Sequence, residues 1–308
     1  MNELVLHHYE GSPFSEKVRL MLGFKGLAWR SVMVPAVMPK PDVLALTGGY
    51  RRTPILQAGA DIWCDTALIA RVLERRQPSP TLFPASAPLA GPLAQWADST
   101  LFWTVIPYAM QPAGVAHVFA GLSADAMKAF AADRKPFTAG LVRRTAADAT
   151  AELGRHLATL EAQLADGRAF LFGAVASVAD FSVAHCLWFV HRAAPLAGIL
   201  SPFAALGRWY ERMAAFGHGR STRMSSADAV ALAAASREHE PASVLPGLGF
   251  EPGQPVSVSA TDYGRDPVEG TLVGLSADEV VIRRTDERAG TLHVHFPREG
   301  FQIKEQTA

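Results

Sequence analysis

Apolar positions along the start of the chain switch repeatedly between the spacing of strands and that of helices. Residues 13–25 carry Phe14, Val18 and Met21 on one helical face, whereas residues 53–57 form a short apolar run that contains Pro54. The pattern predicts strands at residues 4–9, 29–34, 53–57 and 61–64, and helices at residues 13–25, 41–46 and 65–76.

The predicted order β-α-β-α-β-β-α is that of the thioredoxin fold, and we assign it to a domain of residues 1–83. Five prolines between residues 77 and 92 are too many for a helix or strand interior, so a linker is predicted there. Ala-rich helical spacing, with no convincing strand alternation, then predicts an all-α domain at residues 88–236. Its helices are expected near residues 88–106, 123–133, 138–165, 178–193, 201–216 and 225–236.

A second joint, rich in proline and glycine, follows at residues 237–253, and beyond it the apolar spacing changes to period two. Strands are predicted near residues 256–259, 270–273, 280–282, 291–296 and 301–303. This spacing predicts a small five-stranded, SH3-like β-barrel module at residues 253–308. The module carries nine acidic against six basic side chains, which disfavours a nucleic-acid-binding barrel. The expected fold class is α+β multidomain.

Composition narrows the function classes. Of 308 residues, 49% are hydrophobic and 19% charged, so the chain can bury a sizeable core and is not disordered as a whole. Because 29 basic residues balance 29 acidic ones, no global field favours nucleic acid or an anionic membrane. Because the chain has only two cysteines, Cys64 and Cys186, a disulfide framework and a Cys-rich zinc site are excluded.

The uncharged stretch at residues 99–124 contains Pro107 and Pro112 and is a poor membrane span. No targeting segment is evident, so we expect a cytoplasmic protein.

The first candidate motif, Ser12-Pro13-Phe14-Ser15, stands where the first predicted strand ends and the first helix begins. Ser12 is a good helix N-cap and Pro13 suits the first helical position, so the motif has a purely structural interpretation. A serine hydroxyl at a helix N-terminus also stabilises an anion such as a thiolate. Lowering a thiol pKa of ~8.5 by about two units needs roughly 2.7 kcal/mol. A hydrogen bond to a charged group supplies about 1.5–3 kcal/mol and the helix end about 0.3–1 kcal/mol.

Two further motifs lie in the second half of the same predicted domain. Arg52-Thr53-Pro54 opens the third strand, where a cis Thr53–Pro54 bond would turn the Thr53 N–H and C=O toward a ligand's peptide backbone. Asp65 and Thr66 begin the next helix and cap it in the structural interpretation. They also present a carboxylate and a hydroxyl beside backbone N–H groups, which suits an amino-acid head group.

In this order and spacing, the three motifs resemble the N-terminal domain of cytosolic glutathione S-transferases. The resemblance extends to about residue 216 through the helical segment, which includes a Ser177-x-x-Asp180 capping box with a structural role. It implies glutathione as the co-substrate and a homodimer as the assembly. Ser12 matches the thiolate-stabilising serine of the Ser-type classes, with a tau-, zeta- and omega-like motif. Tyr9 is the rival, because other classes activate the thiol with a tyrosine at the end of the first strand.

The same resemblance assigns the remaining glutathione contacts. Arg52 would pair with the glycyl carboxylate, and Thr53, beside Pro54, would hold the cysteinyl backbone. Asp65 and Thr66 would grip the γ-glutamyl group, at positions where the family usually has Glu-Ser. The shorter aspartate reaches one methylene less far than glutamate.

A second-substrate pocket is expected between the two domains, along the first long helix of the all-α domain. Its candidate lining residues are aromatic: Trp96, Phe102, Trp103 and Tyr108. The uncharged stretch of residues 99–124 would form an apolar wall.

No metal is expected. His185 and His191 share one predicted helix without carboxylate support, and His293 and His295 share one face of a predicted strand. Two ligands alone do not make a metal site.

The expected function is therefore that of a glutathione transferase-like enzyme, whose activated thiolate attacks an apolar electrophile, as in detoxification. A glutathione-dependent isomerase is the neighbouring alternative. A non-catalytic binding or scaffold protein is the alternative from another class, and the extra C-terminal β module motivates it.

Overall fold

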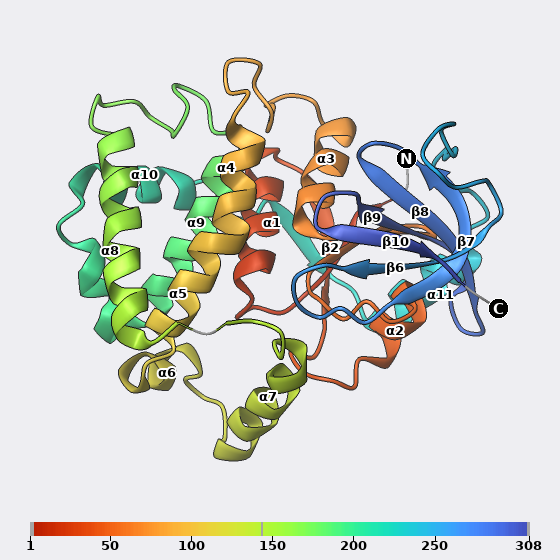
Figure 1. Ribbon diagram of the computed structural model, residues 1–308, viewed down its shortest axis with the longest axis horizontal. Coiled ribbons are helices and arrows are strands. Elements are labelled where there is room, and N and C mark those ends of the chain that lie inside the picture. Colours follow the sequence, from red (N-terminus) through yellow and green to blue (C-terminus); the bar gives the residue numbers. More distant parts are fainter. Residues whose placement is uncertain (1–2, 143, 307–308) are drawn as a thin grey trace.

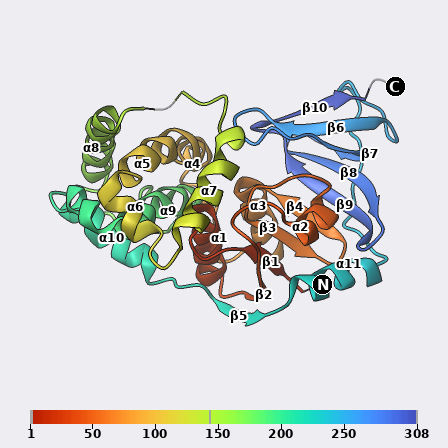
Figure 2. The same cartoon turned by 90° about the horizontal axis from the view of Figure 1, so that it is seen from below.

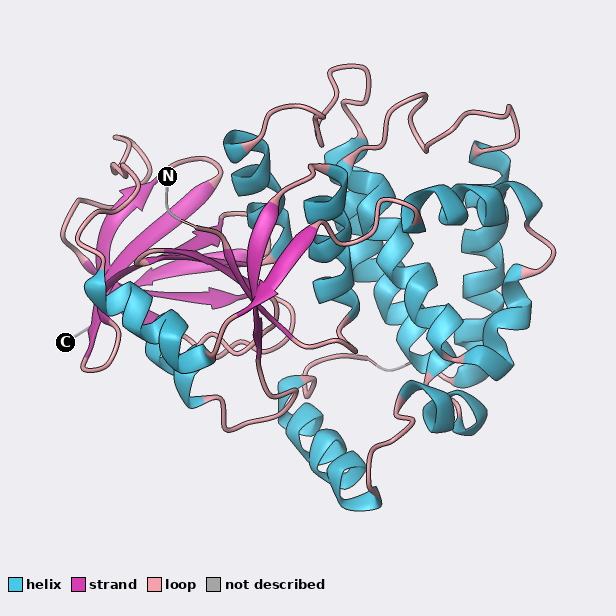
Figure 3. Ribbon diagram, turned by 180° about the vertical axis from the view of Figure 1, so that it is seen from behind, coloured by secondary structure: helices cyan, strands magenta, loops and turns pink. Residues whose placement is uncertain are grey.

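The computed structural model describes residues 3–142 and 144–306. Most helices lie on one side of the molecule and most strands on the other (Figure 1, Figure 3). The strands are β1 (Val5–His8), β2 (Ala28–Met33), β3 (Ile55–Ala58), β4 (Asp61–Cys64), β5 (Arg220–Arg223), β6 (Pro255–Ala260), β7 (Val268–Leu275), β8 (Glu279–Asp286), β9 (Gly290–Pro297) and β10 (Phe301–Glu305). The helices are α1 (Pro13–Phe24), α2 (Pro41–Thr47), α3 (Thr66–Arg76), α4 (Ala90–Trp96), the π-helical η1 (Ala97–Leu101), α5 (Phe102–Ala109), α6 (Pro112–Val118), α7 (Ala124–Phe137), α8 (Ala146–Gln163), α9 (Val178–Arg192), the 3-10 helix η2 (Ala194–Leu200), α10 (Ala204–Ala214) and α11 (Ser226–Ala235).

The predicted thioredoxin-like order is confirmed in the N-terminal domain. β1 pairs in parallel with β2 and antiparallel with β3, which pairs antiparallel with β4. α1 begins where expected because Ser12 caps it and Pro13 occupies the first helical position. Along β1 the side chains alternate, so that Leu6 packs on one face of the sheet and Val5 on the other.

The helical domain is confirmed, with differences in detail. The helix expected at residues 88–106 is α4, η1 and α5 in succession, and a separate α6 follows where Pro112 starts a new helix. The helix expected at residues 138–165 begins at Ala146, and residue 143 of that expectation lies outside the described residues. No helix in the described part of the chain is long and apolar enough to cross a membrane.

The capping box of α9 is confirmed. The Ser177 backbone N–H donates to Asp180 Oδ2 at 2.8 Å, and Trp209 Nε1 donates to Asp180 Oδ1 at 2.8 Å. This fully buried carboxylate therefore ties the start of α9 to α10, a structural role.

The expectation of no strands between residues 88 and 236 is wrong at one place. β5 pairs in parallel with β2, and α11 then packs on α2 and β9, so the chain returns beneath the N-terminal domain after α10 (Figure 2). The four residues of β5 are all exposed and polar or charged. They show no alternation of apolar and polar positions, so the sequence pattern carries no strand signal there.

The five strands expected in the C-terminal module are confirmed, but the module is not detached. Its strands follow the order β10-β6-β7-β8-β9, and β9 pairs in parallel with β4. The module therefore extends the N-terminal sheet into a single ten-stranded sheet. The SH3-like label stays a prediction.

Two apolar clusters lie on opposite sides of this sheet. The first joins α1 and α3 to the helical domain, and it includes Leu6, Trp63 and Phe181. The second joins α2 and α11 to the C-terminal module, and it includes Ile62 and Phe296. The N-terminal domain shares its core with both neighbours.

Candidate functional site

Ser12 lies at the N-terminus of α1 and is almost fully buried, with 2% of its surface exposed. Its Oγ accepts the Ser15 backbone N–H at 3.1 Å, as an N-cap does. A hydroxyl that accepts through its oxygen keeps its own O–H free to donate. Tyr9 is half-buried nearby, and the Lys40 ammonium lies 5.9 Å from the centre of its ring.

The peptide bond between Thr53 and Pro54, whose cis form the sequence analysis considered, is cis in the structure. Lys40 Nζ donates to Thr53 Oγ1 at 3.0 Å and to the Arg51 carbonyl oxygen at 3.3 Å. Burial lowers the pKa of Lys40 to about 8, and the neighbouring positive charges of Arg134 and Arg51 lower it too. Lys40 thus fixes the position of the chain just before β3, where Thr53 lines the cavity.

Asp65 is the N-cap of α3, and its side chain accepts the Ala67 backbone N–H at 2.8 Å. Its φ of 75° is the one positive value at a residue other than glycine in the described ranges. Such a conformation costs free energy, and it is retained where the surrounding structure fixes it, often at ligand sites. Burial raises the pKa of the Asp65 carboxyl.

A charged network lies behind Thr66. The fully buried Lys17 Nζ donates to Thr66 Oγ1 at 3.1 Å and to Asp98 Oδ2 at 2.5 Å. Asp98, from η1, also hydrogen-bonds His185 Nε2 of α9 at 2.9 Å. Although burial disfavours its charge, Lys17 and His185 hold the pKa of Asp98 below its usual range. The network joins the N-terminal domain to the helical domain at the edge of the cavity.

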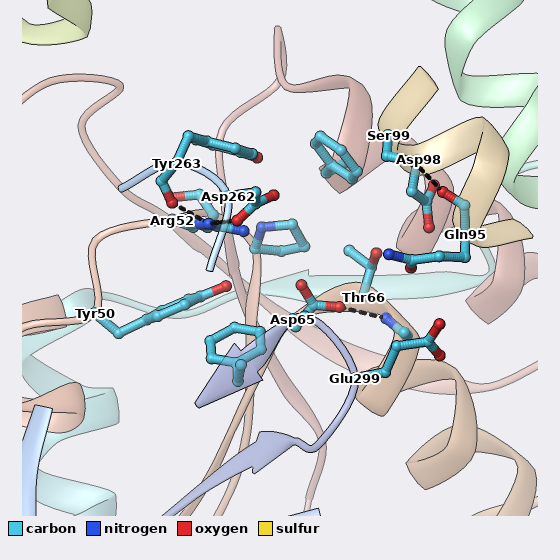
Figure 4. A pocket seen from close by; sticks show the side chains of 16 residues that line it. Tyr50, Arg52, Asp65, Thr66, Gln95, Asp98, Ser99, Asp262, Tyr263 and Glu299 are labelled. Atoms are coloured by element: carbon cyan, nitrogen blue, oxygen red, sulfur yellow. Dashed lines mark hydrogen bonds and ion pairs between the residues drawn. The ribbon is translucent and has the colours of Figure 1, made fainter. Parts of the chain in front are cut away.

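These elements surround a cavity of about 70 Å³ that the C-terminal module closes on one side. Figure 4 shows the labelled side chains around it, with Arg52 close to Asp262 and Tyr263. From the N-terminal domain it is lined by Phe14, Tyr50, Arg52, Thr53, Pro54, Asp65, Thr66 and Ala67; from the helical domain by Gln95, Asp98 and Ser99; and from the C-terminal module by Asp262, Tyr263, Glu299, Gly300 and Phe301.

The β6–β7 loop of the module engages Arg52 directly. The Arg52 guanidinium donates to Asp262 Oδ1 and to the Tyr263 carbonyl oxygen, and it lies over the Tyr263 ring at 3.8 Å from the ring centre. Burial raises the pKa of Tyr263 to about 12, so this ring stays protonated at neutral pH. Arg52 therefore already has a carboxylate partner within the chain.

The structure brings together Arg52, Thr53, Pro54, Asp65 and Thr66 of the predicted glutathione contacts. Ser12 and Tyr9 are not among the residues that line the cavity.

The four aromatic residues expected around the second substrate also lie outside the cavity lining. Trp103 packs edge-on against Tyr263 with ring centres 5.1 Å apart, and Trp96 packs against His156. Phe102 is buried, and the Tyr108 hydroxyl donates to the Leu196 carbonyl oxygen at 2.6 Å.

Sequence reasoning missed the cavity residues from the C-terminal module and the network of Lys17 and Asp98. Asp262, Tyr263 and Glu299 lie in turns between strands, without a motif that marks them. A local signal did exist for Lys17: it faces the same side of α1 as the apolar Phe14 and Met21, where a charge needs a buried partner.

Comparisons with known proteins agree with the fold. A sequence model described as the N-terminal domain of glutathione S-transferase matches residues 6–81, and one described as the C-terminal domain matches residues 129–212. A GST-like protein from Pseudomonas syringae is 41% identical, and the structural match covers 99% of this chain and 100% of that chain, with a TM-score of 0.82. That match therefore includes the C-terminal module.

Two more distant structures are similar in fold alone. A glutathione S-transferase from Rhodospirillum rubrum is 20% identical, with a TM-score of 0.51, over 68% of this chain and 87% of that chain. A tau class glutathione S-transferase from mango is 16% identical, with a TM-score of 0.52, over 69% of this chain and 89% of that chain. None of the curated protein sequences compared with this chain matches it.

Proposed function

Because the chain belongs to the glutathione S-transferase superfamily, we propose that it binds glutathione in the cavity between β3, α3, η1 and the C-terminal module. The observation that carries this proposal is the convergence of Thr53, Asp65 and Thr66 on one cavity. The positive φ at Asp65 is a backbone feature that a helix cap does not itself need.

Ser12 is proposed to stabilise the glutathione thiolate. Its oxygen already accepts the Ser15 N–H, so its O–H can donate to a sulfur anion placed at the start of α1. Because Ser12 is buried and does not line the closed cavity, this role requires that ligand binding opens the site to the start of α1. The thiolate then forms a bond to an electrophilic carbon, and the leaving group departs with its electron pair. An apolar electrophile is the proposed second substrate. Cytoplasmic detoxification is the corresponding role.

Glutathione binding is proposed to displace the β6–β7 loop. Sites for ligands of drug size usually enclose about 300 Å³ or more, whereas this cavity encloses about 70 Å³. The Asp262 carboxylate also occupies Arg52, the proposed partner of the glycyl carboxylate. The Asp262 carboxylate and the glycyl carboxylate of glutathione compete for the Arg52 guanidinium. The β6–β7 loop opens when the glycyl carboxylate replaces Asp262 on Arg52.

A non-catalytic binding protein is the second candidate. The same pairing of Arg52 with Asp262 favours it, because an arginine satisfied within the chain gains less from an incoming carboxylate. The proposed homodimer, the usual assembly of the superfamily, serves either function and is checked by light scattering.

The deciding experiment is a calorimetric titration of glutathione into the purified full chain. We expect millimolar or tighter binding that Arg52→Ala weakens. Arg155→Ala is the matched control, because Arg155 lies exposed on α8, and it should leave binding unchanged. Turnover is then measured with aryl halides and α,β-unsaturated carbonyls. Binding without turnover would support the non-catalytic candidate, and no binding would contradict both.

A further inference from the structure

Three histidines surround one carboxylate where the C-terminal module meets the N-terminal sheet. β4 and β9 lie side by side (Figure 2). They pair in parallel, which places Asp61 opposite His293 and Trp63 opposite His295. His239 reaches the same place from the irregular segment of residues 237–253. None of these residues lines the cavity described above.

The nitrogen atoms of the histidines converge on a single oxygen. Asp61 Oδ1 lies 3.7 Å from His239 Nδ1 and 3.9 Å from His293 Nδ1, and His295 Nε2 hydrogen-bonds it at 3.0 Å. The Nδ1 atoms of His239 and His293 are buried and have no hydrogen-bond partner among residues 3–142 and 144–306. Leaving a buried polar atom unpaired lowers the stability of the fold. Two such nitrogens beside one carboxylate indicate that a partner belongs between them.

We propose that Asp61, His239 and His293 bind a divalent transition-metal ion, and that zinc is the ion this donor set suits. Two imidazole nitrogens and one carboxylate oxygen form a common zinc ligand set, with a fourth position that water can fill. The three side chains are 3%, 19% and 14% exposed, so the site is enclosed but open to an ion from solvent.

The donor atoms need two adjustments to hold the ion. In a tetrahedral zinc site, ligand atoms at bonding distance lie about 3.4 Å apart, so the nitrogen-to-oxygen distances would close by a few tenths of an ångström. The His239 and His293 rings are stacked, with centres 3.8 Å apart and planes 17° from parallel. Because an imidazole lone pair lies in the plane of its ring, the two rings would turn out of this stack to point both Nδ1 atoms at the ion.

Neighbouring groups hold the carboxylate and the joint segment in place. His295 also hydrogen-bonds Glu279 Oε1 at 2.7 Å, so its ring is fixed between two carboxylates. The Glu240 backbone N–H donates to Asp61 Oδ2 at 3.0 Å, and the Glu240 side chain pairs with Arg76 at 2.6 Å. These contacts orient Asp61 and keep the segment that carries His239 against β4.

An ion bound here joins β4, the joint segment and β9. Binding to the folded chain alone raises its stability by mass action. Such an ion therefore fastens the C-terminal module to the N-terminal domain.

The test uses the untagged full-length chain, stripped with a chelator and dialysed. Zinc chloride is titrated by calorimetry, thermal unfolding is followed with and without zinc, and Co²⁺ is added for its visible absorption. We expect one ion per chain, a higher unfolding temperature, and the intense bands of tetrahedral cobalt.

The variants His239→Gln and His293→Gln should each weaken zinc binding by more than about tenfold. His117→Gln is the matched control, because His117 lies exposed on α6, and it should bind as the parent does. His239 lies outside the strands, so its variant remains informative if His293→Gln fails to fold. Absent binding in the parent, or equal affinity in the parent and in His239→Gln, would overturn the proposal.

Discussion

Arg52 of the N-terminal domain lies over the ring of Tyr263 of the C-terminal module, with its guanidinium carbon 3.8 Å from the centre of the ring. The contact places the Asp262 carboxylate on the same guanidinium. A residue proposed to bind ligand is thus held by a loop that lies more than 200 positions further along the chain.

Removing that internal carboxylate should strengthen glutathione binding. Asp262 is half exposed, so its ion pair is worth about 0.2–1 kcal/mol, and Asp262→Asn should lower the dissociation constant of glutathione by about 1.4- to fivefold. Asp266→Asn, in the same loop and exposed, is the control. Weaker binding in Asp262→Asn would mean that the carboxylate helps to hold the ligand, contrary to the proposed competition.

Removing the Ser12 hydroxyl should lower turnover more than stability. Ser12 caps α1, and an alanine there costs about 0.5–2 kcal/mol, whereas a glycine costs only a few tenths of a kcal/mol. Ser12→Gly should therefore keep the fold in urea unfolding while turnover falls about tenfold or more. Tyr9→Phe serves as the comparison. If turnover survives in Ser12→Gly and is lost in Tyr9→Phe, the assignment of the activating hydroxyl is wrong.

The buried pair of Lys17 and Asp98 should be costly to break from one side. Asp98→Asn leaves the fully buried Lys17 ammonium without its counter-ion, which should destabilise the fold by about 3–5 kcal/mol. The double variant Lys17→Met with Asp98→Asn should recover much of that loss, because no uncompensated charge remains. Free energies of unfolding in urea measure both, and equal losses in the single and double variants would contradict this account.

Stability should fall as the pH drops from 6.5 to about 4, in part because of His7. Burial lowers the pKa of His7 to about 4, although a hydrogen bond to Gln57 at 2.7 Å opposes the shift. Between these two pH values His7 is protonated in the unfolded chain and neutral in the folded one. Lowering the pH therefore reduces the free energy of unfolding by up to about 3 kcal/mol. His7→Gln should flatten the pH dependence, and His117→Gln should leave it unchanged. An unaltered slope in His7→Gln would assign the acid sensitivity elsewhere.

Local signals explain what the sequence predicted well. Pro13 and Ser12 mark the start of α1, and Asp65 with Thr66 marks the start of α3, because helix caps depend on neighbouring residues alone. The spacing of apolar residues likewise indicated all five strands of the C-terminal module.

The contacts that could not be predicted join residues that lie far apart in the sequence. His293 meets Asp61 because β9 pairs with β4 in one register, and Tyr263 meets Arg52 because the C-terminal module docks beside the cavity. The side chains of β4 and β9 do not indicate which strand each one pairs with, because pairing at a sheet edge depends on backbone groups that all residues share. The histidines of β9 could be seen on one face from the sequence, but the carboxylate beside them could not.

The shared ten-stranded sheet also sets an order for folding during synthesis. β4 emerges from the ribosome early, yet its partner β9 is completed only at Pro297. At ordinary translation rates this interval is on the order of ten to fifty seconds. Throughout this interval the nascent N-terminal domain exposes the unpaired edge of β4 and its own part of an apolar cluster, which is the kind of surface on which unfinished chains aggregate.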